Sequence, residues 1–452
     1  MSVEPRVFAD TPELAQECEQ AARTLGLETR TEVVDDPLHE AAGAISRGDR
    51  CLVACADEVP VLGVVALARA ASAVSADVVV AIVGRDAPLA DARAIASDLG
   101  LVAVGEPTEL AAAAALLGAG AERPWNASVR ALPAADRARL AGTLGAAERP
   151  SGKLTREEDG VLAWSAGANG RPVRVGRARD LAAALAALRA SAVAPASASA
   201  EQPPGRVDPR AVLDVIFGPP RRLSDPASKA ALRPYGVPVP VEELCASPSR
   251  AAAEATRIGF PVRIALASPD LRVWDHPELA IDDVDNAARV RDVFRQITSL
   301  GRARAPLARL LGVTVTATTP ARALLQVHIA PLDGDLVLAR VGFADGHGRA
   351  SRDETVLVLP APAERIALGL ARLRGASMLV EADTWPDGLE PLADVLSVLA
   401  AFQRDRRLEV ESVEVNPLAL LVGAGAEVRE ACVTVGDAFL RDLGAPAPSQ
   451  PP

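Results

Sequence analysis

The chain has 452 residues, of which 49% are hydrophobic and only 3% aromatic, and its formal net charge is −11. This length and composition predict a soluble, globular protein of about two to four domains, with cores of alanine, leucine, valine and isoleucine. The negative charge disfavours nucleic acid as the main partner, and no run of about 18 apolar residues indicates a membrane span. The first residues lack the basic and apolar regions of a secretory signal, so we expect a cytoplasmic protein.

Cysteine and lysine usage limits the chemistry that the chain can perform. The five cysteines are scattered with a spacing that fits no common zinc site, so we expect ordinary buried thiols in a reducing compartment. Only two lysines occur, Lys153 and Lys229, and the other Lys-or-Arg positions are all arginine. A site that needs an ammonium group therefore has few residues to draw on.

Residues 1–120 alternate short apolar runs with helical patterns. Strands that alternate with helices of about 10–15 residues are typical of a parallel sheet, so we predict a flavodoxin-like (βα)5 domain. A degenerate phospho-receiver domain is the alternative, although the paired acidic residues and late lysine of such a domain are missing. The predicted strands are 6–9, 28–34, 51–56, 76–83 and 101–104, and the predicted helices are 12–25, 39–47, 60–74, 89–99 and 108–117.

Two phosphate-binding signatures are absent from the first half of the chain. No Gly-x-Gly-x-x-Gly follows the first strand, so a dinucleotide-type site for coenzyme A is doubtful. A P-loop at 145–155 is excluded because Leu154 stands where a hydroxyl residue must follow the lysine. We expect His39, near a helix start, to be a surface residue.

Residues 121–190 predict a small α+β unit. It comprises a helix at 132–140, a hairpin from 152 to 175 that turns around 167–170, and a helix at 180–188. The Ala/Ser/Pro-rich residues 191–206 predict a flexible linker, and residues 441–452 a disordered tail.

Residues 223–271 contain the most informative pattern in the chain. Ser224 or Asp225 is expected to cap a helix that ends at the Gly236 turn. A second helix at 250–258 is followed by Gly259 and a buried strand at 262–266.

This order of elements resembles the opening of the ATP-grasp domain of the NDP-forming acyl-CoA synthetases. The resemblance is carried by Lys229, by Tyr235-Gly-Val-Pro238, by Gly259-Phe-Pro-Val262 and by Ser268-Pro-Asp270. It implies that residues 207–440 form a two-lobed domain that holds ATP or ADP and magnesium between its lobes. Residues 1–120 would then be the flavodoxin-like CoA-ligase-type domain of the same synthetases.

Matching the family pattern position by position implies a set of binding residues. Glu414 and Asn416 resemble the acid and amide that ligate magnesium, two residues apart on one strand face. The implied nucleotide-binding residues are Lys229, Arg263, Gly342 and Asp353.

Several family positions carry residues without the required chemistry. The strand lysine is replaced by Ala265, although Arg263 lies on the same strand face and is a candidate substitute. An acidic position is Leu324, and a glutamate position is Arg349. The histidine position is not retained, and we expect His276 to be a loop residue. No catalytic residue is therefore assigned.

The leading functional hypothesis is a pseudoenzyme, a catalytically degenerate synthetase relative that serves as a regulatory or scaffolding subunit. One alternative is an active ligase subunit that uses Arg263, Asp353, Glu414 and Asn416 and needs a separate CoA-binding chain. Another is a nucleotide sensor. We expect a protein partner or a homo-oligomer, with ATP or ADP and magnesium as candidate cofactors, and neither nucleic acid nor membrane as partner.

Overall fold

The computed structural model describes residues 5–119 except 57 and 85, then 127–128, 132–140, 152–166, 172–197, 209–345, 350–380, 384, 387–423 and 425–438. It divides into two compact units, Met1–Ala196 and Ser197–Pro452. The division falls inside the predicted linker. The finer domain boundaries drawn from the sequence stay predictions, and the predicted tail and residues 198–206 of the linker lie outside the described residues.

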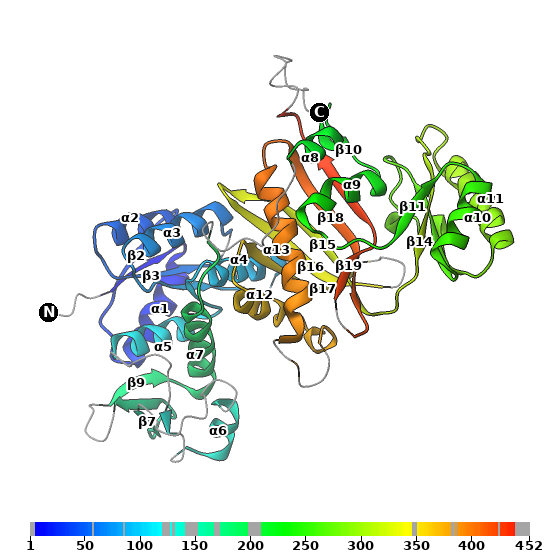
Figure 1. Cartoon of the computed structure of the whole chain (residues 1–452). Helices are drawn as coiled ribbons and strands as arrows, with labels where there is room; N and C mark the ends of the chain where they lie inside the picture. The colour runs from blue at the N-terminus through cyan, green and yellow to red at the C-terminus, as the bar shows by residue number, and fades with distance from the viewer. Residues whose placement is uncertain are drawn as a thin grey trace. The chain divides into compact units, whose positions relative to one another are not determined.

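The first unit is built on a five-stranded parallel sheet with helices on both faces (Figure 1). The strand order is β2-β1-β3-β4-β5, which is the order of flavodoxin-like sheets. The predicted α/β architecture is thus confirmed, with each predicted element within a few residues of its observed bounds. The elements are β1 (Arg6–Ala9), α1 (Pro12–Thr24), β2 (Arg30–Val33), α2 (Pro37–Ser46), β3 (Cys51–Cys55), α3 (Val61–Ala73), β4 (Val79–Ile82), α4 (Ala87–Asp98), β5 (Val102–Val104) and α5 (Pro107–Gly118).

Burial and capping explain why these residues form these elements. All residues of β3 and β4 are buried, as expected for strands covered on both faces. The Thr11 hydroxyl accepts a hydrogen bond from the Leu14 N–H at 3.2 Å and caps α1. The Asp36 carboxylate accepts one from the His39 N–H at 3.0 Å and caps α2, where His39 is exposed as predicted.

The middle segment contains four paired strands where we predicted one hairpin. β7 (Gly152–Arg156) and β8 (Leu162–Ala166) pair around a turn whose Asp159 carboxylate accepts from the Val161 N–H, and β8 then pairs with β9 (Val173–Gly176). The predicted antiparallel pairing on either side of residues 167–170 is present between β8 and β9, but the prediction missed the first turn; residues 167–171 lie outside the described part. The remaining elements are β6 (Ala127–Ser128), α6 (Ala134–Leu140) and α7 (Ala178–Ala192).

The middle segment shares its hydrophobic core with the parallel sheet. One cluster of buried side chains includes Val79 of β4, Leu116 of α5, Trp164 of β8 and Leu185 of α7. Helix α7 extends further than predicted, through Ala192, because its Ala- and Leu-rich sequence favours the helix up to that point.

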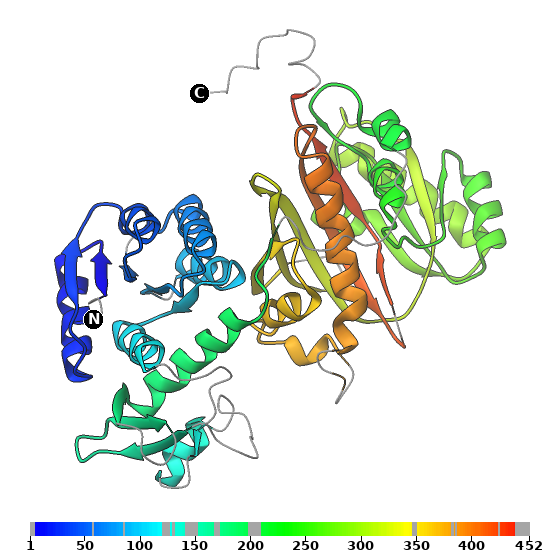
Figure 2. The same cartoon turned by 60° about the vertical axis from the view of Figure 1, so that its left-hand side comes forward.

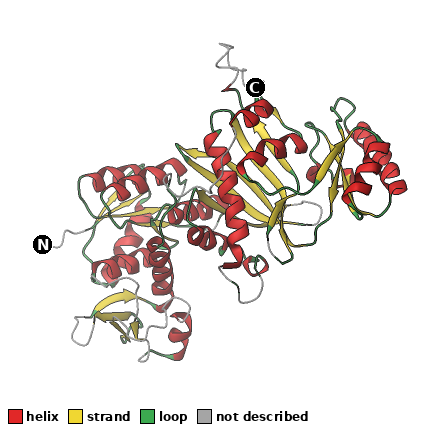
Figure 3. Ribbon diagram, viewed as in Figure 1, coloured by secondary structure: helices red, strands yellow, loops and turns green. Residues whose placement is uncertain are grey.

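The second unit contains a large antiparallel sheet in the order β10-β20-β18-β15-β16-β17, with β19 paired to β18. Helix α13 (Glu390–Asp405) lies along this sheet and supplies much of its core (Figures 2 and 3). The strands are β10 (Arg221–Arg222), β15 (Ala321–Asp333), β16 (Leu336–Ala344), β17 (Ala350–Leu359), β18 (Val410–Leu421), β19 (Ala426–Val428) and β20 (Ala431–Val435), and the other helices are α8 (Pro209–Ile216), α9 (Asp225–Leu232) and α12 (Ala363–Leu370).

A smaller lobe of the same unit has its own four-stranded antiparallel sheet, in the order β11-β14-β12-β13, and its own core. The predicted helix at 250–258 and strand at 262–266 are both present. Two antiparallel lobes are the architecture expected for residues 207–440. The elements are β11 (Glu242–Cys245), α10 (Pro248–Ile258), β12 (Val262–Ala267), β13 (Ala280–Val284), α11 (Ala287–Arg304) and β14 (Gly312–Ala317).

Two helical segments of the second unit end at glycines. Gly236 ends the short 3-10 turn after α9 with a left-handed φ of +87°, and Gly259 ends α10 with a φ of +102°. The predicted side-chain cap of α9 is wrong. Ser224 occupies the cap position but makes no capping hydrogen bond, and the Asp225 carboxylate instead accepts from the Ala431 N–H at 2.8 Å.

All five cysteines are buried as predicted, and their thiols are free. Burial raises the pKa of Cys18 to about 12 and the pKa of Cys51, Cys245 and Cys432 to about 11, and it also raises the pKa of Cys55. Such thiols resist ionisation at neutral pH. Within the part of the chain that the structure describes, no helix combines the length and apolar character needed to cross a bilayer.

Candidate functional site

Two cavities lie in the second unit where residues of the smaller lobe face the large sheet. The first has a volume of about 490 Å3 and is lined by Arg263, Trp274, Leu324, Asn416 and Glu430 among others. The second has a volume of about 430 Å3 and shares Trp274 and Asn416 with the first. We call these two cavities together the interlobe cleft. Their volumes lie in the range of small-molecule sites.

Strand alternation places polar side chains on the cleft face of the large sheet. On β15, Leu325, Val327 and Ile329 are fully buried in the core beneath α13, while Gln326 and His328 line the second cavity. His328 is directly opposite Glu414 of β18 and Arg340 of β16. Because directly opposed residues share a face, these three side chains form one row across the floor of the cleft.

Arg272 reaches from the smaller lobe to the predicted metal ligand Glu414. Its Nη1 lies 2.7 Å from Glu414 Oε2, and its Nε lies 2.7 Å from Asp275 Oδ2. The guanidinium also stacks over Trp274, 5.4 Å from the ring centroid. Burial alone would lower the pKa of Arg272, but these carboxylates outweigh it and raise the pKa. The guanidinium is therefore permanently charged.

Arg263 forms a second bridge between the lobes. Its Nη2 donates to the Glu430 carboxylate, and its Nη1 lies 2.9 Å from Asp282 Oδ1. Burial alone would lower the pKa of Arg263, but the Glu430 and Asp282 carboxylates outweigh burial, and the pKa is raised. Arg263 lines the first cavity, where its charge is paired with carboxylates of the protein, and its predicted role in nucleotide binding stays a prediction.

The donor set around Glu414 does not fit the magnesium ion that the resemblance implies. Magnesium is held by carboxylates and waters in octahedral geometry, whereas the Glu414 carboxylate is in contact with a guanidinium. Asn416 supplies an amide, but Leu324 supplies no oxygen ligand. Among the described residues, no group of three or more His, Cys, Asp or Glu side chains is placed to hold a metal.

Lys229 is buried in an ion-pair cluster of the second unit, and its predicted role in nucleotide binding stays a prediction. Its side chain is only 1% exposed, and Nζ lies 2.9 Å from Asp225 Oδ2 and 2.6 Å from Glu242 Oε2. Burial alone would lower the pKa of Lys229, but the two carboxylates raise it. The ammonium group thus joins α9 to β11, and Lys229 is absent from the lining of the interlobe cleft.

Asp353 likewise stabilises the fold and does not line the cleft. Its two carboxylate oxygens accept hydrogen bonds from the Arg374 N–H at 2.9 Å and the Gly375 N–H at 2.8 Å. Gly342 is close-packed, because a Cβ there would lie 3.0 Å from the Glu354 side chain and 3.1 Å from the Asp353 carbonyl. Arg349 lies outside the described residues.

The positions that lost their family residue also have clear locations. Ala265 is buried in β12, and Leu324 lines the first cavity. His276 lies in the loop between two short 3-10 turns, as predicted, with Nδ1 4.0 Å from Glu278 Oε1. The side chains of Ala265 and Leu324 are apolar, so neither can form an ion pair with a phosphate or ligate a metal.

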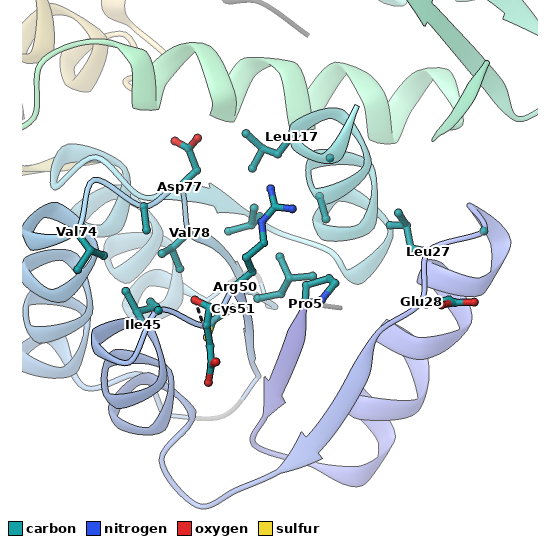
Figure 4. A pocket seen from close by; sticks show the side chains of 18 residues that line it. Pro5, Leu27, Glu28, Ile45, Arg50, Cys51, Val74, Asp77, Val78 and Leu117 are labelled. Carbon is teal, nitrogen blue, oxygen red and sulfur yellow. Dashed lines mark hydrogen bonds between the residues drawn. The ribbon is translucent and has the colours of Figure 1, made fainter. Parts of the chain in front are cut away.

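A third cavity, of about 590 Å3, lies at the amino ends of the parallel strands in the first unit (Figure 4). The side chain of Arg50 extends toward Leu117 across it, and most of its other labelled residues are apolar. Ligands of such sheets bind at the carboxyl ends of the strands. This cavity also contains none of the predicted site residues.

Sequence reasoning missed the residues that set the electrostatics of the cleft. Arg272, Trp274 and Glu430 received no role, although the Ser268-Pro-Asp270 motif directly precedes the first two. The alternation along β15 was the available signal for Gln326 and His328, because it places them opposite the core-facing residues.

Comparison with known proteins identifies the region that contains this cleft. Residues 218–435 match the ATP-grasp domain family. The chain is 23% identical over 210 residues to the β subunit of ADP-forming acetate–CoA ligase II of Pyrococcus furiosus, covering 45% of this chain and 87% of that subunit. It is 23% identical over 214 residues to the β subunit of ligase I, covering 46% and 90%.

A solved structure is also similar to this chain. It is the acetyl-coenzyme A synthetase 1 of Ca. Korarchaeum cryptofilum in complex with coenzyme A and Ca-AMPCP, at 19% identity and a TM-score of 0.42, covering 48% of this chain and 93% of that one. An ATP-grasp domain implies sites for ATP or ADP and magnesium. Residues 218–435 are therefore an ATP-grasp domain, homologous to the β subunits of ADP-forming acetate–CoA ligases.

Proposed function

We propose that this acyl-CoA synthetase-like subunit does not catalyse acyl-CoA formation and serves a regulatory or scaffolding role. The observation that carries the proposal is the ion pair between Arg272 and Glu414. It places a protein cation on the carboxylate that an active relative would use for magnesium. The loss of one electrostatic contact in an active site typically costs about 10²–10³ in rate, and here several are replaced together.

The charges of the cleft support this proposal. Phosphoryl transfer depends on cations that neutralise charge developing on the transferred group. Arg263 and Arg272 are each bound to two carboxylates, so neither supplies a net positive charge to a transferred phosphoryl group, although Arg272 keeps one amino group without a protein acceptor among the described residues. Ala265 and Leu324 provide neither a cation nor a ligand. The cleft keeps its shape while its reactive groups are neutralised or missing.

Assembly with another chain is the second part of the proposal. The relatives from Pyrococcus furiosus are β subunits by name. A subunit without catalytic activity would exert its function by binding other molecules. We propose a protein partner or a second copy of this chain. Sedimentation of the purified chain alone would separate self-association from a need for a different partner.

The decisive experiment measures ADP and acyl-CoA formation from acetate, coenzyme A and Mg-ATP, with the wild-type chain and with Glu414→Gln, each in the presence of a separate CoA-binding ligase subunit, because an active ligase subunit of this kind would need one. We expect both proteins to give the rate of the CoA-binding subunit alone. Turnover near the usual enzyme range of about 1–10³ s⁻¹ that is lost in Glu414→Gln would instead establish an active ligase subunit. Turnover that is equal in both proteins would indicate a contaminating enzyme.

A further inference from the structure

The guanidinium of Arg272 lies between a carboxylate and an aromatic ring in the interlobe cleft. It contacts Glu414, which corresponds to a metal ligand in the resembling family, and it lies over Trp274, which lines both cavities of the cleft. A cation and an aromatic face at the centre of a cleft form a surface suited to an anion attached to a ring system.

This geometry disfavours a divalent cation at Glu414. A magnesium ion bound to the same carboxylate would lie within a few ångströms of the guanidinium, and the two positive charges would repel each other. Arginine remains charged at any physiological pH. Magnesium could therefore bind Glu414 only after Arg272 had moved away.

The guanidinium retains unused capacity for an anionic ligand. Arginine has five N–H donors in a planar fork. Nε is directed to Asp275 and Nη1 to Glu414, and the described residues give the Nη2 amino group no protein acceptor. Gln326, His328 and Asn416 line the same cavity and supply further polar groups around this edge.

We propose that the interlobe cleft binds a nucleoside di- or triphosphate without a divalent cation, with the Arg272 guanidinium contacting the phosphates in place of the metal. The inference deepens the proposed function and rests on it, because the ligand would be bound and not turned over. The two cavities, of about 490 and 430 Å3, share Trp274 and Asn416 in their linings and provide room for base and phosphates. Glu414 then competes with the ligand for Arg272.

The test is calorimetric titration of the full chain with ADP, in EDTA and in excess magnesium. For the wild-type protein we expect binding in EDTA that magnesium does not tighten. Arg272→Gln should weaken ADP binding in EDTA about tenfold or more, since a hydrogen bond to a charged group is lost. Arg309→Gln is the matched control, because Arg309 also forms an ion pair in the smaller lobe but lines neither cavity.

Glu414→Gln distinguishes the proposal from ordinary metal-assisted binding. If Arg272 binds the phosphates, a neutral amide at position 414 releases the guanidinium, and ADP should bind more tightly in EDTA. If Glu414 holds magnesium, wild-type binding should require magnesium and Glu414→Gln should weaken it. This variant also covers the case in which Arg272→Gln fails to fold.

Three results would overturn the inference: a magnesium requirement in the wild-type protein, weaker binding by Glu414→Gln, or no binding of ADP in either buffer. The proposed function is tested separately, by acyl-CoA formation in the same preparations. A chain that binds ADP only with magnesium but makes no acyl-CoA would refute the metal-free site and leave the non-catalytic role intact.

Discussion

Replacing Lys229 by methionine should destabilise the second unit strongly. The side chain is 1% exposed, and its two partners are also largely buried, with side-chain exposures of 17% for Asp225 and 8% for Glu242. Methionine has a similar shape, so the lost volume is small and the effect is mainly electrostatic. Two carboxylates would be left without their counter-ion.

The expected magnitude follows from that burial. Breaking a buried ion pair by removing one partner costs about 3–5 kcal/mol. For a domain of this size, about 1 kcal/mol shifts the unfolding temperature by about 2–4 °C, so the transition should fall by about 6–20 °C. Adding Glu242→Gln to Lys229→Met should recover part of the loss, because one uncompensated charge is removed.

Differential scanning calorimetry of the full chain provides the measurement, and Lys153→Met provides the control. Lys153 is the other lysine of the chain, lies in the first unit and is exposed, so its replacement should leave both transitions nearly unchanged. A loss below about 1 kcal/mol for Lys229→Met, in the range of surface pairs, would refute the structural role. It would favour the predicted role of Lys229 in nucleotide binding.

Three further predictions concern the thiols, a close backbone approach and acid stability. The five cysteines should not react with a thiol reagent at neutral pH until the chain is unfolded, since burial raises their thiol pKa values; rapid labelling of the native protein would contradict this. Gly312→Ala should destabilise the protein by several kcal/mol, because the φ of Gly312 is +131° and a Cβ there would lie 2.2 Å from the Cys245 carbonyl oxygen. Gly236 also has a positive φ but has open space around it, so Gly236→Ala should cost only the backbone strain of about 1–3 kcal/mol. Equal losses of stability for the two variants in urea unfolding would refute the clash. Hydrogen bonds from Arg309 lower the pKa of Asp270, so this carboxylate contributes stability above its unfolded pKa of about 3.9 and loses that contribution as the pH falls through its lower folded value. Asp270→Asn should therefore reduce the acid dependence of the unfolding temperature in that range, and an unchanged dependence would exclude the pair.

The fold was largely predictable because its signals are local. Except for the polar edge strand β2, each strand of the first sheet is a short apolar run between helical patterns. In both units, proline or glycine marks many of the boundaries, as at Gly259 of the second unit. The first turn of the middle segment was missed although Asp159-Gly160 is a strong hairpin signal, and Gly160 has the positive φ that such a turn requires. Elsewhere, where periodicity or turn chemistry was strong, the observed bounds agree within a few residues.

The cleft was less predictable because its contacts join distant residues. Arg272 and Glu414 are 142 positions apart in the sequence, and Arg263 and Glu430 are 167 apart. A motif match indicates which positions face a ligand in relatives, but it does not reveal that the carboxylate of Glu414 forms an ion pair with Arg272 in this chain. Lys229 shows the converse, since a matching residue is buried against two acids.

The burial of Lys229 has a practical consequence for labelling the protein. Amine-reactive dyes, cross-linkers and biotin esters are attacked by solvent-accessible amino groups in their unprotonated form, and the two lysines of this chain differ completely in accessibility. Among lysine side chains, only Lys153 of the first unit is open to such reagents in the native state. Among the side chains, a fluorophore or surface tether would thus be attached at one lysine far along the sequence from the cleft, in addition to any label on the α-amino group of the chain, and modification of Lys229 would report unfolding of the second unit.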